Sequence, residues 1–438
     1  MNKTQNIKPF SFRRHTWQQL KQNKIAFAAI WLLVFFVALA VFAPWLANDK
    51  PFYISVNQHA YFPLLSLKNQ VEFFDANGKS EMMNVEQIDW KHLNYESAIF
   101  PPIAYSANTS DILNSNYKSP NEEQQFKNAN GEIVEMPFRF RHFLGTNKRG
   151  EDVLSGLIYG ASVSLLGGVF SMLIASMIGI FIGLIAGYFG DDKIKLQKGI
   201  VLSLLIGLVF AWFYAFDISW NLLDENSFSF FTQLLFCGLI FLLVLGIFYF
   251  IGKVLSKIAF LNSVIPIPLD NIISRTIEVV VSLPTLLLII TIAAIAKPSM
   301  LNLICIIALV QWTQIARFIR AEMLRLRNAE FIQAAEVLGL KHLQIIFRHA
   351  LPNTVAPALV SISFGIASAI LIESSLSFLG VGVPVEQVTW GSLINSGREN
   401  FQAWWLVVFP GLCIFLTVLV YNILGEALRD AMDVKLKR

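Results

Sequence analysis

Long apolar segments constrain this chain more than any other feature of its sequence. A helix needs roughly 20 mostly apolar residues to cross the hydrocarbon core of a bilayer. Of the 438 residues, 55% are hydrophobic and only 15% are charged, whereas about one quarter of a soluble domain is charged. The sequence therefore predicts a polytopic membrane protein. The eight predicted spans are Ile25–Leu46, Ala161–Tyr188, Ile200–Phe216, Phe230–Ile251, Thr276–Ala294, Leu301–Ile315, Val355–Leu379 and Trp404–Leu424.

The first apolar segment, Ile25–Leu46, is interpreted as a retained membrane anchor. It is longer than the apolar part of a secretory signal peptide, which spans about 7 to 15 residues, and no small-x-small cleavage site follows it. The three cysteines all lie inside apolar runs, where free cysteine packs as a small hydrophobic residue. The six histidines are scattered along the chain. Neither residue type shows the spacing of a metal site, so no metal ligand is predicted.

Basic residues predict how the chain is oriented, because short loops rich in Lys and Arg stay on the cytoplasmic side. Both ends of the chain are rich in these residues, and an even number of spans places both ends on the same side. We therefore expect cytoplasmic N- and C-termini. The basic residues near the ends are Lys3, Lys8, Arg13, Arg14, Lys21, Lys24, Arg429, Lys435, Lys437 and Arg438.

The polar stretch 47–160 separates the first two predicted spans and is far too long for a turn. It contains two Asn-Gly pairs, Asn77-Gly78 and Asn130-Gly131, between apolar or alternating flanks. Such pairs favour type I′ hairpin turns, because both residues tolerate positive φ. We predict a small domain containing β-strands outside the membrane. A largely irregular cap is the alternative.

A short amphipathic helix is predicted between the sixth and seventh spans, in a loop expected on the cytoplasmic side. Asn328 is a candidate N-cap, and Gly339 can adopt the left-handed conformation that ends a helix. Leu351-Pro352 then suits the first turn of the next span. Residues at helical spacing are expected on one face: Phe331, Ala334, Ala335 and Leu338. The helix could rest on lipid headgroups, or its alanines could let another protein approach closely.

This segment resembles the cytoplasmic loop of ABC-importer permeases. In that family the pattern is Glu-Ala-Ala, three residues, Gly, nine residues, a variable position, one more residue and Leu-Pro. The positions that match in register are Ala334, Ala335, Gly339, Leu351 and Pro352. The resemblance implies that the short helix seats in a groove of an ATPase subunit, with Gln333 and Glu336 also in the contact. Gln333 replaces the usual Glu, so a salt bridge to the ATPase at that position is in doubt.

Other stretches are similar to the oligopeptide, dipeptide and nickel branch of the same family. They are Phe143–Ser155, Glu373–Val383, Leu424–Asp433 and the His349–Asn353 ending. Three shorter motifs resemble the N-terminal region of microcin C-type peptide permeases: Ala47–Pro51, Tyr61–Pro63 and Pro101–Ser106. The resemblance implies an all-α protein with the six-helix core of a type I importer permease. Its N-terminal β-containing insertion would be periplasmic, and about 80 additional residues would add a two-helix hairpin.

The expected organisation has five parts. They are 1–46, the tail and first span; 47–160, the periplasmic domain and the lead into the core; 161–190, a core span; 191–270, the inserted hairpin; and 271–438, the rest of the core with a coupling loop at 317–352. The hairpin is interpreted as a peripheral, lipid-facing structural element.

The resemblance also implies the partners and the location. We expect separate ABC ATPase subunits, a second permease subunit in a heterodimer, and a periplasmic or lipid-anchored substrate-binding protein for peptide-like solutes, in a bacterial inner membrane. No nucleic acid and no cofactor are expected. The chain is not expected to be an enzyme, because it has no complete phosphate-binding loop. Gly78-Lys79-Ser80 resembles the end of that loop, but Phe73 stands where its first glycine belongs.

Four residues are candidates for the translocation pathway: Glu278, Ser282, Pro284 and Glu373. An ionisable residue within a span is costly and is by default a functional candidate, but either glutamate could instead lie at an interface or face a helix N-terminus. Pro284 removes a backbone donor and could bend a pore-lining helix together with Ser282.

Two other classes of membrane protein would show different sequence features. A secondary transporter or channel not coupled to ATP would favour paired ionisable residues at mid-membrane or discontinuous repeat helices, and the spans show no such pairs. A membrane-embedded enzyme would need a Ser/His/Asp, H-E-x-x-H or paired-Asp constellation inside the spans, and none is visible.

Overall fold

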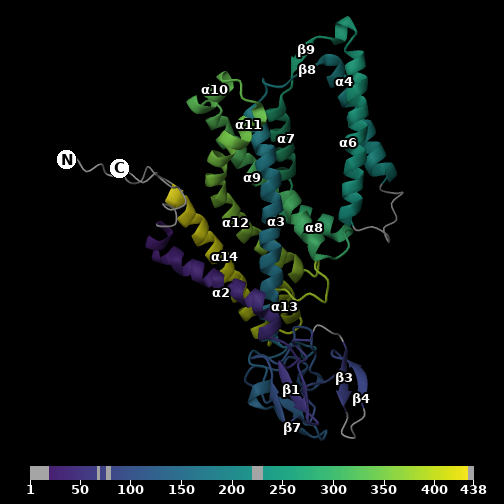
Figure 1. The fold of residues 1–438 in the computed structure, drawn as a ribbon, viewed down its shortest axis with the longest axis vertical. Helices are drawn as coiled ribbons and strands as arrows, with labels where there is room; N and C mark the ends of the chain where they lie inside the picture. Colours follow the sequence, from purple (N-terminus) through teal and green to yellow (C-terminus); the bar gives the residue numbers. More distant parts are fainter. Residues whose placement is uncertain (1–18, 67–69, 75–79, 220–229, 433–438) are drawn as a thin grey trace, which may run out of the picture. The chain divides into compact units, whose positions relative to one another are not determined.

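The computed structural model describes residues 19–66, 70–74, 80–219 and 230–432 (Figure 1). Within these ranges seven helices are long and apolar enough to cross a membrane, and a bent helix pair brings the number to eight if it counts as one span. This agrees with the eight predicted spans. The helices are α2 (Lys24–Leu46), α3 (Val153–Phe189), α4 (Lys198–Trp212), which continues through a wide turn to Ile218, α6 (Phe230–Leu255), α9 (Met300–Leu326), α12 (Leu351–Phe378) and α14 (Trp405–Met432). The basic tail residues before Gln19 and after Met432 lie outside the described residues.

The predicted span Thr276–Ala294 is not one straight helix. It is divided into α7 (Leu269–Ser282) and α8 (Thr285–Ile295), whose axes differ by 83°. The break falls at Leu283-Pro284, where Leu283 is extended with φ −88° and ψ 137°. A residue before proline is pushed out of the helical region, and proline itself cannot donate to the preceding turn. The bend expected at Ser282 and Pro284 is therefore present, and it is much sharper than a kink.

The described chain forms two compact units. One comprises the described residues up to Phe170 and from Ser363 on, and the other comprises the described residues from Ser171 to Ile362. The helices α3 and α12 each contribute to both units, because the boundaries at 170/171 and 362/363 fall inside them.

The first unit contains the predicted β-containing domain, between α2 and α3. The strands β1 (Tyr53–Val56), β2 (His59–Tyr61) and β5 (Ser97–Ile99) form an antiparallel sheet in the order β2-β1-β5. Two hairpins accompany it: β3 (Gln70–Phe74) with β4 (Ser80–Asn84), and β6 (Gln125–Lys127) with β7 (Ile133–Glu135). Two 3₁₀ turns, η1 (Ile112–Asn114) and η2 (Phe138–Phe140), complete it.

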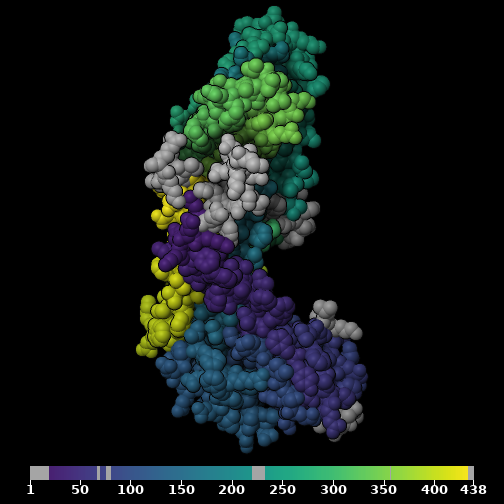
Figure 2. Space-filling model, turned by 60° about the vertical axis from the view of Figure 1, so that its left-hand side comes forward, coloured from purple at the N-terminus to yellow at the C-terminus, as the bar shows by residue number. Residues whose placement is uncertain are grey.

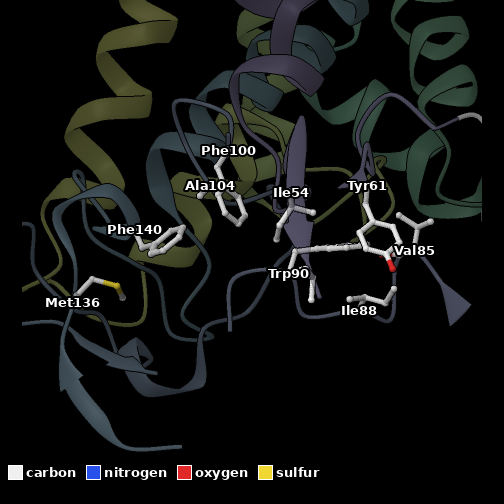
Figure 3. Packing of buried hydrophobic residues seen from close by; sticks show 10 residues of the cluster. Ile54, Tyr61, Val85, Ile88, Trp90, Phe100, Ala104, Met136 and Phe140 are labelled. Atoms are coloured by element: carbon white, nitrogen blue, oxygen red, sulfur yellow. The ribbon is translucent and has the colours of Figure 1, made fainter. Parts of the chain in front are cut away.

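A small aromatic core holds this domain together (Figure 3). Trp90 is buried among Ile54, Tyr61 and Phe73, and its indole Nε1 donates to the carbonyl of Val85 at 3.0 Å. The partner of this N–H is on the same buried loop, so the ring can be removed from water without leaving an unpaired donor.

The turns differ from the predicted type I′ hairpins. Only Gly131 of the Asn130-Gly131 pair has positive φ, at +86°, and β6 and β7 are joined by five residues. The Asn128 side chain organises this loop by accepting from the backbone N–H groups of Asn130 and Glu132. The two-residue turn with positive φ at both positions is instead Asn57-Gln58, between β1 and β2. The Asn77-Gly78 pair lies outside the described residues.

The helix α3 begins earlier than the predicted span Ala161–Tyr188. Its first residue is Val153, because Asp152 accepts a hydrogen bond from the backbone N–H of Ser155 at 2.7 Å and so caps the helix. Trp390, at the start of α13 (Trp390–Gly397), is completely buried against this helix. Its indole donates to the carbonyl of Leu157, and its ring contacts Phe36 of α2 edge-on.

In the second unit, glycines bring α3 and α9 into backbone contact. A Cβ added to Gly183 would lie 2.6 Å from the carbonyl oxygen of Ala316, and Gly179 and Gly187 are equally tight. Small residues every fourth position allow membrane helices to pack this closely. The inserted hairpin consists of α4, extended by the wide turn η3 (Phe213–Ile218), and α6. The strands β8 (Lys195–Gln197) and β9 (Val264–Pro266) pair at its base, with the 3₁₀ turn η4 (Ala259–Leu261) between α6 and β9.

Candidate functional site

The candidate site is the loop between α9 and α12, which contains the short helix α10 (Glu330–Val337). Its N-cap is Ala329, which has no side chain to cap the helix, so the prediction of Asn328 as the cap is wrong. The C-terminal end agrees with the prediction. Gly339 adopts φ +75°, and the N–H of Leu340 returns to the carbonyl of Ala335 at 3.2 Å. This closes the helix with a left-handed glycine.

The two faces of α10 differ in exposure. Ile332 and Ala335 are buried against the rest of the second unit, whereas Phe331 and Ala334 are exposed. The apolar residues that follow are more exposed still, with Val337 at 88% and Leu338 at 79%. The prediction that Ala335 shares the outward face with Phe331, Ala334 and Leu338 is therefore wrong, because Ala335 anchors the helix from inside. The green segment that contains α10 forms part of the surface in Figure 2.

The chain continues from α10 into α12 through α11 (His342–Gln344) and a wide turn, η5 (Ile345–Ala350). Leu351 and Pro352 are the first two residues of α12. The wide turn precedes proline, which has no N–H to donate and whose ring would clash with the carbonyl four residues earlier in a regular helix. Leu351 and Pro352 therefore begin the span, as predicted.

A polar network fixes α10 to the end of α3. Lys193 forms an ion pair with Glu336 of α10, and its ammonium lies 4.1 Å from the centroid of the Tyr188 ring. The Tyr188 hydroxyl lies 2.9 Å from Nδ1 of His342. Burial disfavours ionisation of Glu336, but the hydrogen bond and charge of Lys193, with the Tyr188 hydroxyl and the charge of His342, together outweigh it and lower the pKa of this carboxyl. Glu336 thus faces its own chain. The sequence did not predict that Tyr188, Lys193 and His342 contact α10. The one available signal was the positive charge of Lys193, which places it in a loop expected on the same side of the membrane as α10.

The same end of the unit is tied together by further contacts (Figure 1). Arg320 of α9 forms a two-pronged ion pair with Asp270 of α7. The backbone N–H of Asn271 donates to Asp191, which follows α3, at 3.0 Å. Because α9 also packs on the glycines of α3, a force applied to α10 would act on α3, α7 and α9 together.

Gln333 lies on the exposed part of α10. Its amide Nε2 donates to the carbonyl of Asn328 at 3.4 Å, so it braces the start of the helix. A neutral amide at this position leaves the outward face of α10 without the negative charge that a Glu would contribute.

Two of the pathway candidates lie close together in the second unit. Glu278 and Ser282 line a cavity of about 350 Å³ with Arg317 and Arg320. Glu278 pairs with Arg275 at 2.7 Å, and the Ser282 hydroxyl donates to the carbonyl of Val279. Pro284 is the residue before α8, at the break between α7 and α8.

Glu373 belongs to the first unit and is completely buried in α12. Its carboxylate accepts hydrogen bonds from the hydroxyl groups of Ser377 at 2.7 Å and Ser374 at 3.4 Å. These two serines also lie against Gly391 of α13. Glu373 therefore lies in the first unit where α12 packs on α13, whereas Glu278 and Ser282 belong to the second unit. Across the described residues, no group of three His, Cys, Asp or Glu side chains is placed to hold a metal ion.

Comparisons with known proteins define the class of this chain. Residues 256–437 match the binding-protein-dependent transport system inner membrane component, and residues 11–65 match the N-terminal transmembrane domain of oligopeptide transport permease C. The di/tripeptide transport system permease protein DppC of Pseudomonas aeruginosa is 30% identical over 68% of this chain and 73% of its own length.

Two further relatives cover more of the chain. The dipeptide transport system permease protein DppC of Alkalihalophilus pseudofirmus is 29% identical over 78% of this chain and 82% of its own length. The inner membrane ABC transporter permease protein YejE of Escherichia coli is 27% identical over 95% of both chains. The protein is therefore a multi-span transport permease. It belongs to the family of binding-protein-dependent transport system inner membrane components, the permease subunits of ABC importers.

Proposed function

We propose that this chain carries peptides or peptide-like solutes inward across the bacterial inner membrane, driven by ATP hydrolysis in separate subunits. The observation that carries the proposal is the arrangement of α10. Its outward side presents Phe331, Ala334 and Leu338, while its inward side is anchored by Ile332 and Ala335. An exposed apolar patch on a rigidly held helix is suited to bind another protein. The relatives named for dipeptides and di/tripeptides support the solute class.

The coupling residues follow from this arrangement. Ala334 and the Val337–Gly339 turn would contact the ATPase, with Gln333 at the edge of the contact. Ala335 and Glu336 would transmit its movement, because they join α10 to the rest of the unit. Leu351 and Pro352 would pass that movement to α12, whose first residues they are. Closure of two ATPase subunits would then tilt the spans between inward-facing and outward-facing states.

The orientation that this function requires puts α10 and both termini in the cytoplasm. It is supported by the base of the inserted hairpin, which belongs to the same unit as α10. Lys195, Lys198, Lys253 and Lys257 lie there and are all exposed. Lysines cluster in this way in cytoplasmic loops. The domain between α2 and α3 would then face the periplasm, and residues 191–270 would form a lipid-facing addition to the core.

The partners implied by this function are ABC ATPase subunits, a second permease subunit that completes the pathway as a heterodimer, and a periplasmic or lipid-anchored binding protein. A surface for the binding protein is available in the first unit. A cavity of about 650 Å³ is lined there by Lys148, Arg398 and Glu399, beside α13. In this cavity the Lys148 ammonium pairs with Glu399 at 2.7 Å and Arg149 pairs with Glu151 at 3.5 Å, so Arg398 is the lining cation offered to a partner's carboxylate.

The test is transport by the reconstituted complex, with α10 altered on its two faces. Leu338→Asp places a charge on the exposed face, and we expect it to abolish peptide uptake while the permease still folds and inserts. Ala334→Trp should act in the same way. The matched control is Ile133→Asp, which changes an exposed apolar residue in the domain predicted on the other side of the membrane. It should leave uptake and peptide-stimulated ATPase activity unchanged.

Co-purification of the ATPase subunits separates docking from folding. The ATPase should be lost from Leu338→Asp and retained by Ile133→Asp. If Leu338→Asp and Ala334→Trp both transport peptides at the normal rate, α10 is not the coupling helix. If the intact complex takes up no peptide, the solute class is wrong.

A further inference from the structure

A cavity of about 700 Å³ lies in the β-containing domain of the first unit. Four segments line it: Asp49, which follows α2; the loop 86–92; Tyr105 with residues 109–113; and the β6–β7 turn around Asn128. Sites for small ligands usually have volumes of about 300 to 1,000 Å³ and a few convergent polar groups. The cavity has this size, and Lys91 is a buried cation among the residues that line it.

Lys91 is only 8% exposed, yet among the described residues no carboxylate forms an ion pair with its ammonium group. Its ammonium lies 3.4 Å from the centroid of the Tyr105 ring. Within the described ranges it has no hydrogen-bond acceptor and no carboxylate within 4 Å. Burial lowers the pKa of Lys91 to about 8, although Asp49, Asp111, Asp89 and Asp152 oppose this change. The group therefore stays mostly charged at pH 7 with unused N–H donors.

The platform beneath this ammonium is rigid. The Tyr105 hydroxyl donates to the carbonyl of Phe140 at 2.7 Å, and the ring stacks on the His142 imidazole with centroids 4.1 Å apart. His142 is in turn held between Asp152 and Asp111. Removing a charged group from water without hydrogen-bond partners is costly. A lysine held this firmly without an acceptor is preorganised to receive one from a ligand.

The surrounding charges narrow the class of ligand. Four carboxylates line the cavity with Lys91, those of Asp49, Glu86, Asp89 and Asp111. These carboxylates outnumber Lys91 and Lys127, so the cavity repels a simple anion and favours a positively charged group, while the Lys91 ammonium still needs an acceptor. The ligand must therefore offer an acceptor and a positively charged donor close together. The amino-terminal end of a peptide does so, because its ammonium group is two bonds from its first carbonyl carbon.

We propose that this cavity binds the amino-terminal end of a peptide, with Lys91 donating to the first carbonyl oxygen and the ammonium group facing Asp49 and Asp111. The inference rests on the proposed function, since it assigns the same solute class a second site on the permease itself. Such a site would hold peptides at the membrane surface, apart from the binding protein.

The test uses the full permease complex in nanodiscs, without the binding protein and without ATP, and trialanine as the probe. Binding is measured by isothermal titration calorimetry. Wild type should bind trialanine, and Lys91→Met should weaken binding by about tenfold or more, as expected for loss of a hydrogen bond to a charged group. The matched control is Lys127→Met, which removes an exposed lysine from the rim of the same cavity and should change the affinity less than about twofold.

Changes in the probe test the inference without altering the protein. N-acetyl-trialanine lacks the ammonium group, so its affinity should be at least about tenfold lower than that of trialanine. Trialanine amide keeps the ammonium group and should bind with the affinity of trialanine. Equal binding of the acetylated peptide, or unchanged binding by a folded Lys91→Met, would overturn the proposal. So would an absence of trialanine binding by wild type. Uptake of labelled trialanine by vesicles that contain the complex and its binding protein tests the proposed function separately. If these vesicles take up trialanine but the permease shows no binding that depends on Lys91, the proposed function stands and only this inference is wrong.

Discussion

The Nδ1 atom of His142 lies 2.9 Å from Oδ1 of Asp152, and both side chains are almost completely buried. The other oxygen of the same carboxylate caps α3 by accepting from the backbone N–H of Ser155. One aspartate therefore joins the β-containing domain to the first residues of the long helix α3. Asp111 completes the arrangement, with its carboxylate 3.3 Å from Nε2 of His142.

Loss of either partner should destabilise this junction. Breaking a buried ion pair typically costs about 3 to 5 kcal/mol, because the remaining charge is left uncompensated. We expect Asp152→Asn and His142→Gln each to lower the thermal unfolding midpoint of the purified permease by several degrees. The unfolding midpoint of the double variant should be only slightly lower than that of the less stable single variant, because both changes remove the same interaction. Strictly additive losses would show that the two residues act independently.

The stability of this junction should also depend on pH. Burial disfavours the imidazolium of His142, but hydrogen bonds to Asp111 and Asp152 outweigh it and raise the pKa of His142. The stabilisation is therefore complete below the unfolded-state pKa of about 6.5 and is lost as the pH rises through the higher folded-state value. Thermal unfolding between pH 5 and pH 9 should show wild type losing more stability at high pH than His142→Gln. Parallel curves would contradict this prediction.

The packing of α3 on α9 should tolerate no side chain at Gly183. A Cβ there would lie 2.6 Å from the carbonyl oxygen of Ala316, which is backbone and cannot move aside. We expect Gly183→Ala to lower the yield of folded permease strongly. Gly411→Ala in α14 is the control, because nothing lies within 4 Å of its added Cβ. Gel filtration of both variants measures the outcome, and a normal yield for Gly183→Ala would exclude the close contact.

The ion pair between Lys193 and Glu336 should matter more for coupling than for stability. Both side chains are partly exposed, and such pairs contribute less than about 1 kcal/mol. We expect Glu336→Gln to leave the unfolding temperature almost unchanged and to reduce the peptide transported per ATP hydrolysed severalfold. The exchange of charges in Lys193→Glu with Glu336→Lys should restore part of the loss. If the exchanged pair transports no better than either single change, the contact between these two residues does not carry the coupling.

Trp390 should be the most sensitive single position of the first unit. It is fully buried between α2, α3 and α13, and removal of such a ring costs about 3 to 5 kcal/mol. Trp390→Ala should therefore prevent stable folding at 37 °C. Trp390→Phe keeps one aromatic ring but loses the hydrogen bond to Leu157, worth about 1 kcal/mol, and part of the indole's packing, so it should be destabilised less than Trp390→Ala. Equal stability of the two variants, measured by thermal unfolding, would mean that the ring does not hold α13 in place.

The sequence by itself determined the spans, the left-handed end of α10 at Gly339 and the position of a bend at Pro284. These are local properties, since the length of an apolar run, a glycine after a helix and the geometry of proline act on the chain nearby. Even the family pattern around Gln333–Gly339 is carried by a single continuous segment.

Only the tertiary structure decided which side of α10 faces inward. The helical spacing of Phe331, Ala334 and Ala335 places them near one another around the helix but does not say which side is buried. Alanine is small enough to lie on a buried or an exposed face, and Ala335 is buried together with Ile332. The structure also brought Tyr188 to His342 and Lys193 to Glu336, and it placed Lys91 over Tyr105. No local pattern announces such contacts, because polar side chains distant in sequence pair only when the packing of helices and strands removes them from water together.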